Sequence, residues 1–371
     1  MPCRRSASVN VDDAATVQPI AISSRVTCAM EICLPLVRIL QHGCSFSKSE
    51  AVGALCSITM RDSDHRAAVV AAGAVPPLVA LVEGGDRSVK LNALLTLTNL
   101  AQEDDLTNAV FVAGAIRPLV VLLRSDDDDA NKMAASLLKT LAYARTYGTA
   151  IEAQLRVIKD VAVAAGAVPA LIKIVKTGSG LSKEQAALAL SNLAFHDNQV
   201  HHDNQVLVAA DGVVPLLDLL RDGNDSCKNS AAMALRNLSL WLSDNRVAIA
   251  AAGAIPLLVA AETGSHAGAE NHAAVALHNL GIGNADNQVA IAKARGAEAL
   301  VRIARRGRIE LPWQGRVLSY LPSAGARERV ARLLAARRSV IICKILEDAL
   351  PPEIAASVVA PFLGRWGGSW P

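Results

Sequence analysis

The stretch AAGAVPPLVALV at residues 71–82 is the unit from which this chain is built, because it returns five more times with small changes. The copies are VAGAIRPLVVLL at 112–123, AAGAVPALIKIV at 164–175, AADGVVPLLDLL at 209–220, AAGAIPLLVAAE at 251–262 and KARGAEALVRIA at 293–304. Their glycines, Gly73, Gly114, Gly166, Gly212, Gly253 and Gly296, are 41, 52, 46, 41 and 43 residues apart. A recurring period of this size predicts stacked helical units rather than one globular core.

Composition supports an all-α array. Of the 371 residues 52% are hydrophobic but only 3% are aromatic, so the interior is made of small aliphatic side chains. Such side chains suit many thin helices packed against one another. The longest apolar run, 67–82, is 16 residues long and contains Gly73 and two prolines. A membrane-spanning helix needs about 20 apolar residues, so we expect no transmembrane segment.

Each unit is expected to contain three helices. The glycine ends a short first helix, because glycine takes the left-handed conformation at a helix C-terminus without steric cost. A proline three residues later fits the first turn of a second helix; these are Pro76, Pro169, Pro215 and Pro256. Ser182 with Gln185 suggests a capping box for a third helix.

The third helix ends on a recurring pair of residues. The pairs are Asn99-Leu100, Thr140-Leu141, Asn192-Leu193, Asn237-Leu238 and Asn279-Leu280. From each glycine to this position the distances are 26, 26, 26, 25 and 26 residues. The spacing within a unit is therefore nearly constant, and extra length at 143–160 and 196–206 is expected to fall between units.

The A-G-A-[IV]-P corner and the terminal N-L pair of the third helix resemble the armadillo repeat family. The repeat sequences are similar to those of the armadillo arrays of plant U-box proteins and of vacuolar scaffolds, although this chain has no U-box sequence. The resemblance implies a right-handed α-solenoid of stacked three-helix repeats. We expect a disordered or loosely ordered N-terminus at 1–27, an array of about six units at 28–306 with degenerate first and last units, and a basic helical cap or tail at 307–371.

The recurring asparagines are the first candidate functional residues: Asn99, Asn192, Asn237 and Asn279. Asparagine is not favoured inside helices, and Thr140 interrupts the series. Residues seven before and one before this position share its helical face. That face is polar and lightly charged, and it adds the candidates Asn92, Lys139, Gln185, Arg236 and His272.

This face suits an extended peptide. Packed helices lie about 8–10 Å apart, which is close to the length of three extended residues. An asparagine amide offers a donor and an acceptor that match a peptide unit. The armadillo resemblance implies the same arrangement, with third helices lining a concave groove and asparagines clamping the ligand backbone. A second interpretation stays open, in which these asparagines bridge neighbouring helix ends within the solenoid.

The residues four before the asparagine position argue against one subfamily. In importin-α-like grooves tryptophans stand there, whereas here the residues are Leu95, Ser136, Leu188, Met233 and Val275. Recognition of nuclear-import cargo is therefore disfavoured.

No catalytic motif is recognisable. TGSGLSKE at 177–184 lacks the ending of a phosphate-binding loop, and no G-x-S-x-G motif occurs. The run Asp126–Asp129 lacks the spaced oxygens and glycine of a calcium loop, and negative charge at a helix N-terminus explains it better. We expect no enzyme activity, metal or cofactor, and a scaffold or adaptor that binds a protein partner.

Two alternative functions remain. Residues 295–344 hold 12 Arg and Lys and three acids, a net charge of 12 − 3 = +9, whereas the whole chain is +3 and the remainder is −6. This segment could bind nucleic acid or an anionic surface, or cap the array. The resemblance also permits a substrate adaptor for a ubiquitin ligase acting in trans. Seven cysteines without a C-x-x-C pair, and no recognisable secretory signal, favour an intracellular protein, cytoplasmic or nuclear.

Overall fold

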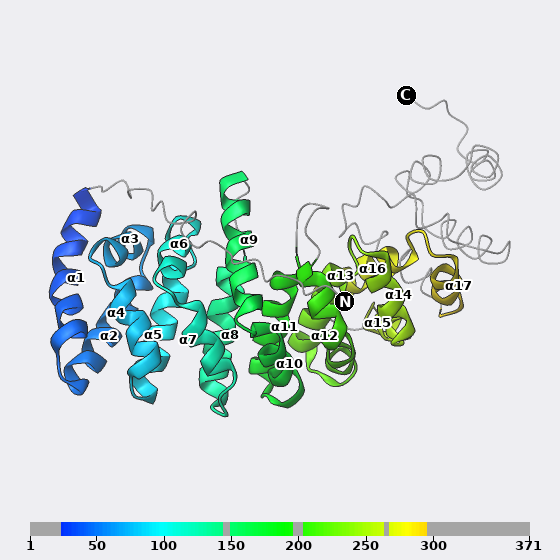
Figure 1. Ribbon diagram of the computed structural model, residues 1–371, viewed down its shortest axis with the longest axis horizontal. Coiled ribbons are helices and arrows are strands. Elements are labelled where there is room, and N and C mark those ends of the chain that lie inside the picture. The colour runs from blue at the N-terminus through cyan, green and yellow to red at the C-terminus, as the bar shows by residue number, and fades with distance from the viewer. Residues whose placement is uncertain (1–23, 144–148, 196–202, 263–266, 295–371) are drawn as a thin grey trace, which may run out of the picture. The chain divides into compact units, whose positions relative to one another are not determined.

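The computed structural model describes residues 24–143, 149–195, 203–262 and 267–294, and every regular element within these ranges is a helix (Figure 1). The first eleven helices are α1 (Ser24–His42), α2 (Ser45–Thr59), α3 (Ser63–Ala71), α4 (Val75–Gly84), α5 (Arg87–Leu100), α6 (Asp104–Val112), α7 (Ile116–Leu123), α8 (Asp128–Leu141), α9 (Thr149–Ala164), α10 (Ala167–Thr177) and α11 (Gly180–Ala194). The others are α12 (Asp203–Asp222), α13 (Asp225–Leu238), α14 (Ser243–Ala251), α15 (Ala254–Glu262), α16 (Ala267–Gly281) and α17 (Ala285–Lys293).

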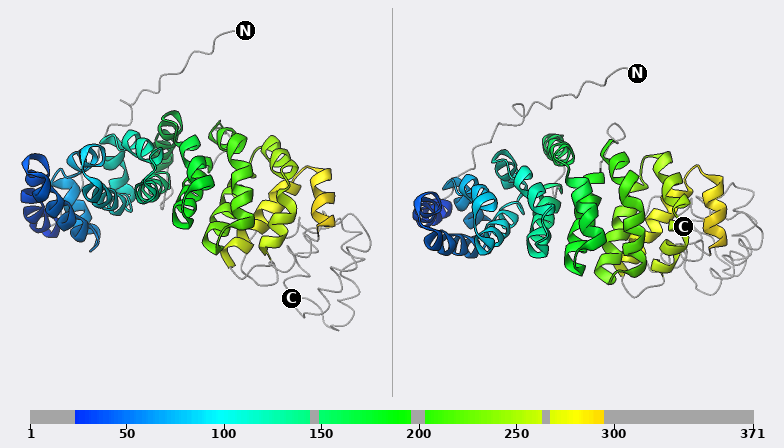
Figure 2. Two further views of the ribbon diagram at one scale, coloured as in Figure 1. Left: turned by 90° about the horizontal axis from the view of Figure 1, so that it is seen from below. Right: turned by 60° about the horizontal axis from the view of Figure 1, so that its bottom comes forward.

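The described residues form two compact units. Unit 1 contains 24–143, 149–195 and 203–211, and unit 2 contains 212–262 and 267–294. In unit 1 the third helices pack in sequence, α2 against α5, α5 against α8 and α8 against α11 (Figure 2). In unit 2, α13 packs against α16 in the same manner. The predicted all-α solenoid of three-helix repeats is confirmed. Its complete repeats are α3–α5, α6–α8, α9–α11 and α14–α16.

The glycine corners form as predicted at four positions. Gly73, Gly114, Gly166 and Gly253 have φ values of 78°, 82°, 88° and 84°. These are left-handed conformations that side chains with a Cβ rarely adopt. Each corner turns the chain sharply, and the helix pairs α3–α4, α6–α7 and α14–α15 are bent by 80°, 80° and 83°.

The corner predicted at Gly212 is wrong. Helix α12 continues from Asp203 to Asp222 and contains both Gly212 and Pro215. Glycine permits the left-handed conformation but does not impose it, and the fixed φ of proline is compatible with a helix. The last predicted corner, Gly296, lies outside the described residues.

Polar side chains cap the third helices at their N-termini. Asp86 accepts from the Val89 amide, Asp127 from the amides of Asp129 and Ala130, and Asn224 from the Cys227 amide. The cap of α11 is Ser179, which accepts from the Ser182 amide. The capping box predicted at Ser182 is therefore wrong, because the helix has already begun at Gly180.

The C-terminal ends of the third helices are capped from the following repeat. The last carbonyls of a helix have no partner within it, and here side chains of the next first helix donate to them. Arg66 donates to the Thr59 carbonyl at 3.3 Å and Thr107 to the Ala101 carbonyl at 3.1 Å. Asn245 donates to Leu238 at 3.4 Å, and Asn287 to Leu280 at 2.9 Å. These bonds fix α3, α6, α14 and α17 to the third helices that precede them.

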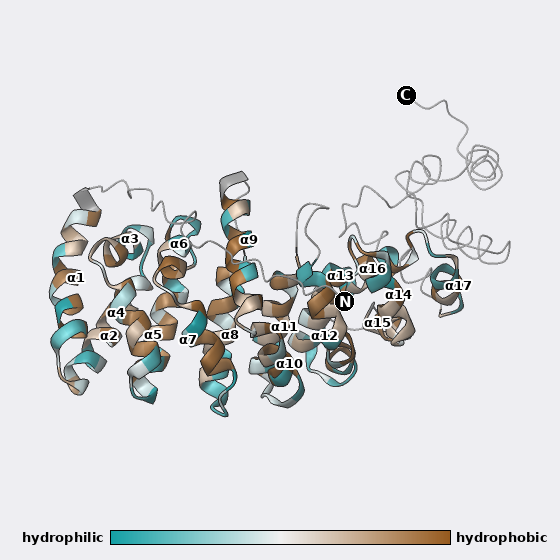
Figure 3. Cartoon of the chain, in the orientation of Figure 1, coloured by the Kyte–Doolittle hydropathy of each residue, from teal (hydrophilic) through white to brown (hydrophobic). Residues whose placement is uncertain are grey.

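The core consists of aliphatic side chains between the helices of each unit. Leu78, Leu119 and Leu171, all five residues after a corner glycine, are at most 1% exposed. In unit 1 the hydrophilic colour of Figure 3 gathers mainly at the turns that join the helices. Among the described residues, no single helix is both long and apolar enough to cross a membrane, although the three bent pairs named above reach that length and composition together.

Parts of the predicted organisation fall outside these ranges. The predicted loose terminus at 1–27 overlaps the description only in its last four residues, which begin α1. The basic segment 295–344 and the predicted cap or tail at 307–371 lie wholly outside the described residues, as does the C-terminal end of the predicted array.

A glycine pair separates the effect of the left-handed conformation from that of packing. Gly73 and Gly53 both have open space where a Cβ would stand, but Gly73 has a φ of +78° whereas Gly53 lies inside α2. We expect Gly73→Ala to lower the free energy of unfolding by about 1 kcal/mol, and Gly53→Ala to raise it by about 0.5–1 kcal/mol. Chemical denaturation of both variants checks this, and equal effects would contradict it.

Candidate functional site

The recurring asparagines are buried at the end of the third helices. Asn99, Asn192, Asn237 and Asn279 are 9%, 6%, 2% and 5% exposed. The Nδ2 of Asn99 donates to the Thr59 hydroxyl at 3.2 Å, and that of Asn192 to the Lys139 carbonyl at 2.9 Å. The Nδ2 of Asn279 donates to the Ser239 hydroxyl at 3.1 Å and to the Arg236 carbonyl at 3.4 Å. In these three residues the amide donor therefore binds the preceding third helix.

Two of the three residues bond a hydroxyl in the same way, and the third bonds a carbonyl of the same helix turn. Thr59 and Ser239 each stand two residues after the asparagine position of their own helix. Their hydroxyls donate to the carbonyl three residues back, Thr59 to Cys56 at 2.8 Å and Ser239 to Arg236 at 2.7 Å. In α8 the equivalent of these hydroxyl residues is Ala142, so Asn192 reaches the carbonyl of Lys139 directly. We call this asparagine-to-preceding-helix bond the repeat staple.

Thr140 shows what happens without an asparagine. Its hydroxyl donates to the Ser136 carbonyl of its own helix at 2.9 Å, as threonine commonly does inside helices. Of the two interpretations that the sequence left open, bridging within the solenoid is thus observed for Asn99, Asn192 and Asn279. A ligand contact by the asparagines stays a prediction, and their Nδ2 groups are already engaged.

The other candidate residues line the accessible side of the third helices. Positions seven, four and one before the asparagine are half-buried on α5, α8, α11, α13 and α16, except for the buried Ser191, Ser230 and His278. We call these positions the open stripe. It includes the predicted Asn92, Lys139, Gln185, Arg236 and His272, and also Leu95, Leu188, Met233 and Val275.

In unit 1 two predicted residues meet across neighbouring repeats. The Lys139 Nζ on α8 donates to the Gln185 Oε1 on α11 at 2.7 Å. The bond runs between third helices that are also joined by the Asn192 staple, so the polar surface and the buried staple share one pair of helices. Asn92 lies on α5, one repeat earlier.

In unit 2 the stripe carries an arginine and a neutral histidine. The Arg236 Nε is buried without an acceptor among the described residues, and burial lowers the pKa of this guanidinium. Burial, and secondarily the charge of Arg236, lower the pKa of His272 to about 4. At neutral pH this part of the stripe therefore carries one positive charge.

Three further polar residues on or beside the third helices were not predicted. Thr59 and Ser239 were missed because a serine or threonine hydroxyl near a helix end commonly bonds its own backbone. The sequence signal that could have found them is their separation of 40 residues from the asparagine whose amide donates to them. Asn229 stands one residue before the position that the face predicted, and its Oδ1 is buried without a donor among the described residues.

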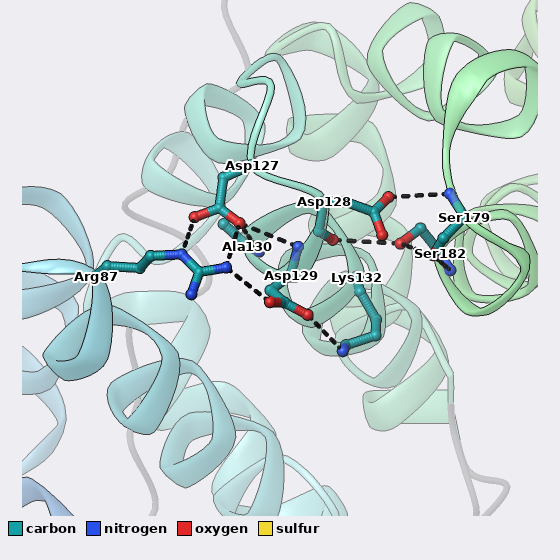
Figure 4. Close-up of polar contacts among 8 residues, drawn as sticks. All are labelled: Arg87, Asp127, Asp128, Asp129, Ala130, Lys132, Ser179 and Ser182. Carbon is teal, nitrogen blue, oxygen red and sulfur yellow. Dashed lines mark hydrogen bonds and ion pairs between the residues drawn. The ribbon is translucent and has the colours of Figure 1, made fainter.

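The run Asp126–Asp129 ties neighbouring repeats together (Figure 4). Arg87 of α5 binds Asp127 at 2.8 Å and Asp129 at 2.7 Å, and Lys132 binds Asp129 at 2.9 Å. Asp128 accepts from the Ser179 amide at 3.0 Å, which reaches the start of α11.

These contacts lower the pKa values of three carboxylates, chiefly through Arg87 for Asp127, Ser179 for Asp128 and Lys132 for Asp129. The described residues contain no cluster of three metal-ligating side chains. The run Asp126–Asp129 thus stabilises helix N-termini and also links neighbouring repeats.

Comparison with known proteins agrees with this geometry. The model of the Armadillo/beta-catenin-like repeat matches residues 62–102 and 158–195. These spans contain α3–α5 and most of α9–α11, including their corner glycines and the asparagines Asn99 and Asn192. The chain contains armadillo/beta-catenin-like repeats.

Solved structures share its fold. An engineered protein is 26% identical with a TM-score of 0.61, covering 68% of this chain and 99% of its own. A designed armadillo repeat protein is 22% identical with a TM-score of 0.60, covering 67% and 99%. Another, solved in complex with peptide (KR)4, is 22% identical with a TM-score of 0.59, covering 67% and 98%. No curated protein matches this chain.

The staple can be tested within one helix of this chain. We expect Asn279→Ala to lower the free energy of unfolding by about 1–2 kcal/mol, because it removes a buried donor between repeats. Asn271→Ala, on the same helix but half-buried and outside the staple, is the control and should cost less than about 0.5 kcal/mol. Denaturant titration of both variants gives the comparison, and equal losses would contradict the staple.

His272 predicts a stability change in acid. Its pKa is about 4 in the folded protein and 6.5 in an unperturbed histidine. Between these values the unfolded chain binds more protons, so stability is lost as the pH falls from about 6.5 to about 4. The loss from this residue is about 2 kcal/mol at pH 5. Comparing the wild type with His272→Gln by denaturation at pH 7.5 and 5 isolates it, and an identical pH dependence would refute it.

Proposed function

We propose that this chain is a non-catalytic protein-interaction scaffold that binds an extended segment of a partner along the open stripe. The observation that carries the proposal is that buried and accessible positions of the third helices have different roles. Their buried asparagines join the repeats, whereas the positions seven, four and one before them keep accessible polar and apolar side chains. A surface that served packing alone would have no need to repeat this pattern from helix to helix.

The spacing of the stripe supports an extended ligand. Third helices are direct neighbours within each unit, and packed helices are about 8–10 Å apart. An extended chain covers that distance in about three residues, so one repeat would serve about three ligand residues. The designed armadillo repeat protein in complex with peptide (KR)4 has the same fold, which makes peptide binding a reasonable use of it.

The stripe also offers the mixture of groups that such a ligand needs. Leu95 and Leu188 give apolar contact area, while Asn92 and the Lys139–Gln185 pair give donors and acceptors for a backbone. The recurring asparagines position these side chains by fixing the distance between third helices. Within this proposal the stripe residues contact the ligand and the asparagines hold the surface together.

The test places a bulky charge on the stripe. A peptide selected from a random dodecapeptide library displayed against the full chain serves as the probe. We expect Leu188→Arg, on the stripe of α11, to weaken its binding at least tenfold, or about 1.4 kcal/mol. Val121→Arg is the matched control, because Val121 is 67% exposed on the second helix α7, away from the stripe.

Fluorescence anisotropy gives the dissociation constants, and thermal unfolding checks that both variants are folded. Equal binding by the two variants would place the ligand elsewhere. Failure to select any peptide that binds the full chain would count against an extended ligand altogether.

A further inference from the structure

Arg236 is the charged residue of the open stripe whose side chain has no hydrogen-bond or ion-pair partner in the described structure. Its guanidinium forms no ion pair and no hydrogen bond with any described residue, and its Nε is buried. A buried donor without an acceptor is unfavourable, and more so when it is charged. The folded protein thus maintains an unfavourable group at an accessible position.

Four acids of unit 2 stand near the N-termini of their helices. Asp225, Asp244, Glu270 and Asp286 stand in the first turns of α13, α14, α16 and α17. Arg236 stands in the last turn of α13. Acids near helix N-termini and bases near C-termini both suit the helix dipole, so Arg236 and these four acids stand at opposite ends of their helices.

The surroundings of Arg236 define what would fit. His272, on the neighbouring α16, is neutral at pH 7 because its pKa is about 4. The site therefore carries one positive charge, which balances one carboxylate but not a phosphate dianion. Of the three guanidinium nitrogens only Nε is fully buried without an acceptor, which leaves the two terminal nitrogens for a ligand. Two parallel N–H donors match the two oxygens of a carboxylate.

We propose that Arg236 forms a subsite of the open stripe for a single carboxylate, the side chain of an aspartate or glutamate in the bound partner. This inference rests on the proposed function, and it adds the chemical class that unit 2 selects. It also sets this stripe apart from the designed protein solved with peptide (KR)4, since a basic side chain would be repelled at Arg236.

The first experiment observes the site itself and does not depend on an extended ligand. Capped single residues, N-acetyl-glutamate methylamide and N-acetyl-glutamine methylamide, are titrated into the isotope-labelled full chain. We expect the glutamate compound to shift the Arg236 Nε–H resonance and to raise the pKa of His272, because the carboxylate offsets the arginine charge. The glutamine compound should do neither.

The second experiment measures selectivity. Octapeptides of alternating Glu-Ala, Gln-Ala and Lys-Ala are compared on the wild type, on Arg236→Gln and on Arg221→Gln. Arg221 is the matched control, an exposed arginine of unit 2 that pairs with Asp218. The wild type should bind the Glu-Ala peptide about tenfold more tightly than the Gln-Ala peptide, and the Lys-Ala peptide most weakly. Arg236→Gln should abolish this preference, and Arg221→Gln should preserve it.

The outcomes separate the two proposals. If the capped glutamate shifts Arg236 but no octapeptide binds, the carboxylate subsite stands and the extended-ligand function fails. If octapeptides bind with no preference for glutamate, the scaffold function stands and the carboxylate subsite is overturned. Inorganic phosphate that shifts Arg236 at lower concentration than the capped glutamate would overturn the choice of a carboxylate.

Discussion

The C-terminal end of each third helix is the place on which the rest of the structure depends. Its last carbonyls have no partner within the helix, and the chain satisfies them with side chains from the next repeat. At the end of α13, Asn279 reaches the Arg236 carbonyl from the following third helix, and Asn245 reaches the Leu238 carbonyl from the following first helix. The two kinds of bond orient successive helices with respect to one helix end, so the stacking geometry is specified by hydrogen bonds as well as by aliphatic packing.

This arrangement explains why a polar residue recurs inside a helix. An asparagine in a helix interior gains nothing from propensity, but a buried amide that bonds the preceding repeat fixes register in a way that leucine and alanine cannot. Thr140 marks the repeat in which this bond is replaced by one within α8. There the link between neighbouring repeats comes from the surface instead, where Arg87 of α5 binds Asp127 and Asp129 of the next third helix.

Much of the fold could be predicted from the sequence, because its determinants are local. A glycine that must turn left-handed and a proline that begins a helix are read within a few residues, as at Gly73 and Pro76. Gly212 is also followed by a proline three residues later and still continues a helix, since glycine allows both conformations and does not choose between them. The asparagines were identified as special from their 26-residue spacing, but their partners Thr59 and Ser239 lie 40 residues away and were found only in three dimensions.

The open stripe could likewise be predicted in part: its residues follow from the sequence, but their contacts do not. Residues of the stripe follow from helical periodicity, which is why Asn92, Lys139 and Gln185 could be named from the sequence. Whether each of these side chains already has a hydrogen-bond partner does not follow from helical periodicity. Lys139 bonds Gln185, whereas Arg236, at the equivalent position in unit 2, bonds no described side chain. A sequence that agrees with its fold at every level leaves few such groups unsatisfied, and the exceptions concentrate where function is carried. No described acid forms an ion pair with Arg236, so within the described residues its guanidinium stays available for a carboxylate of a ligand.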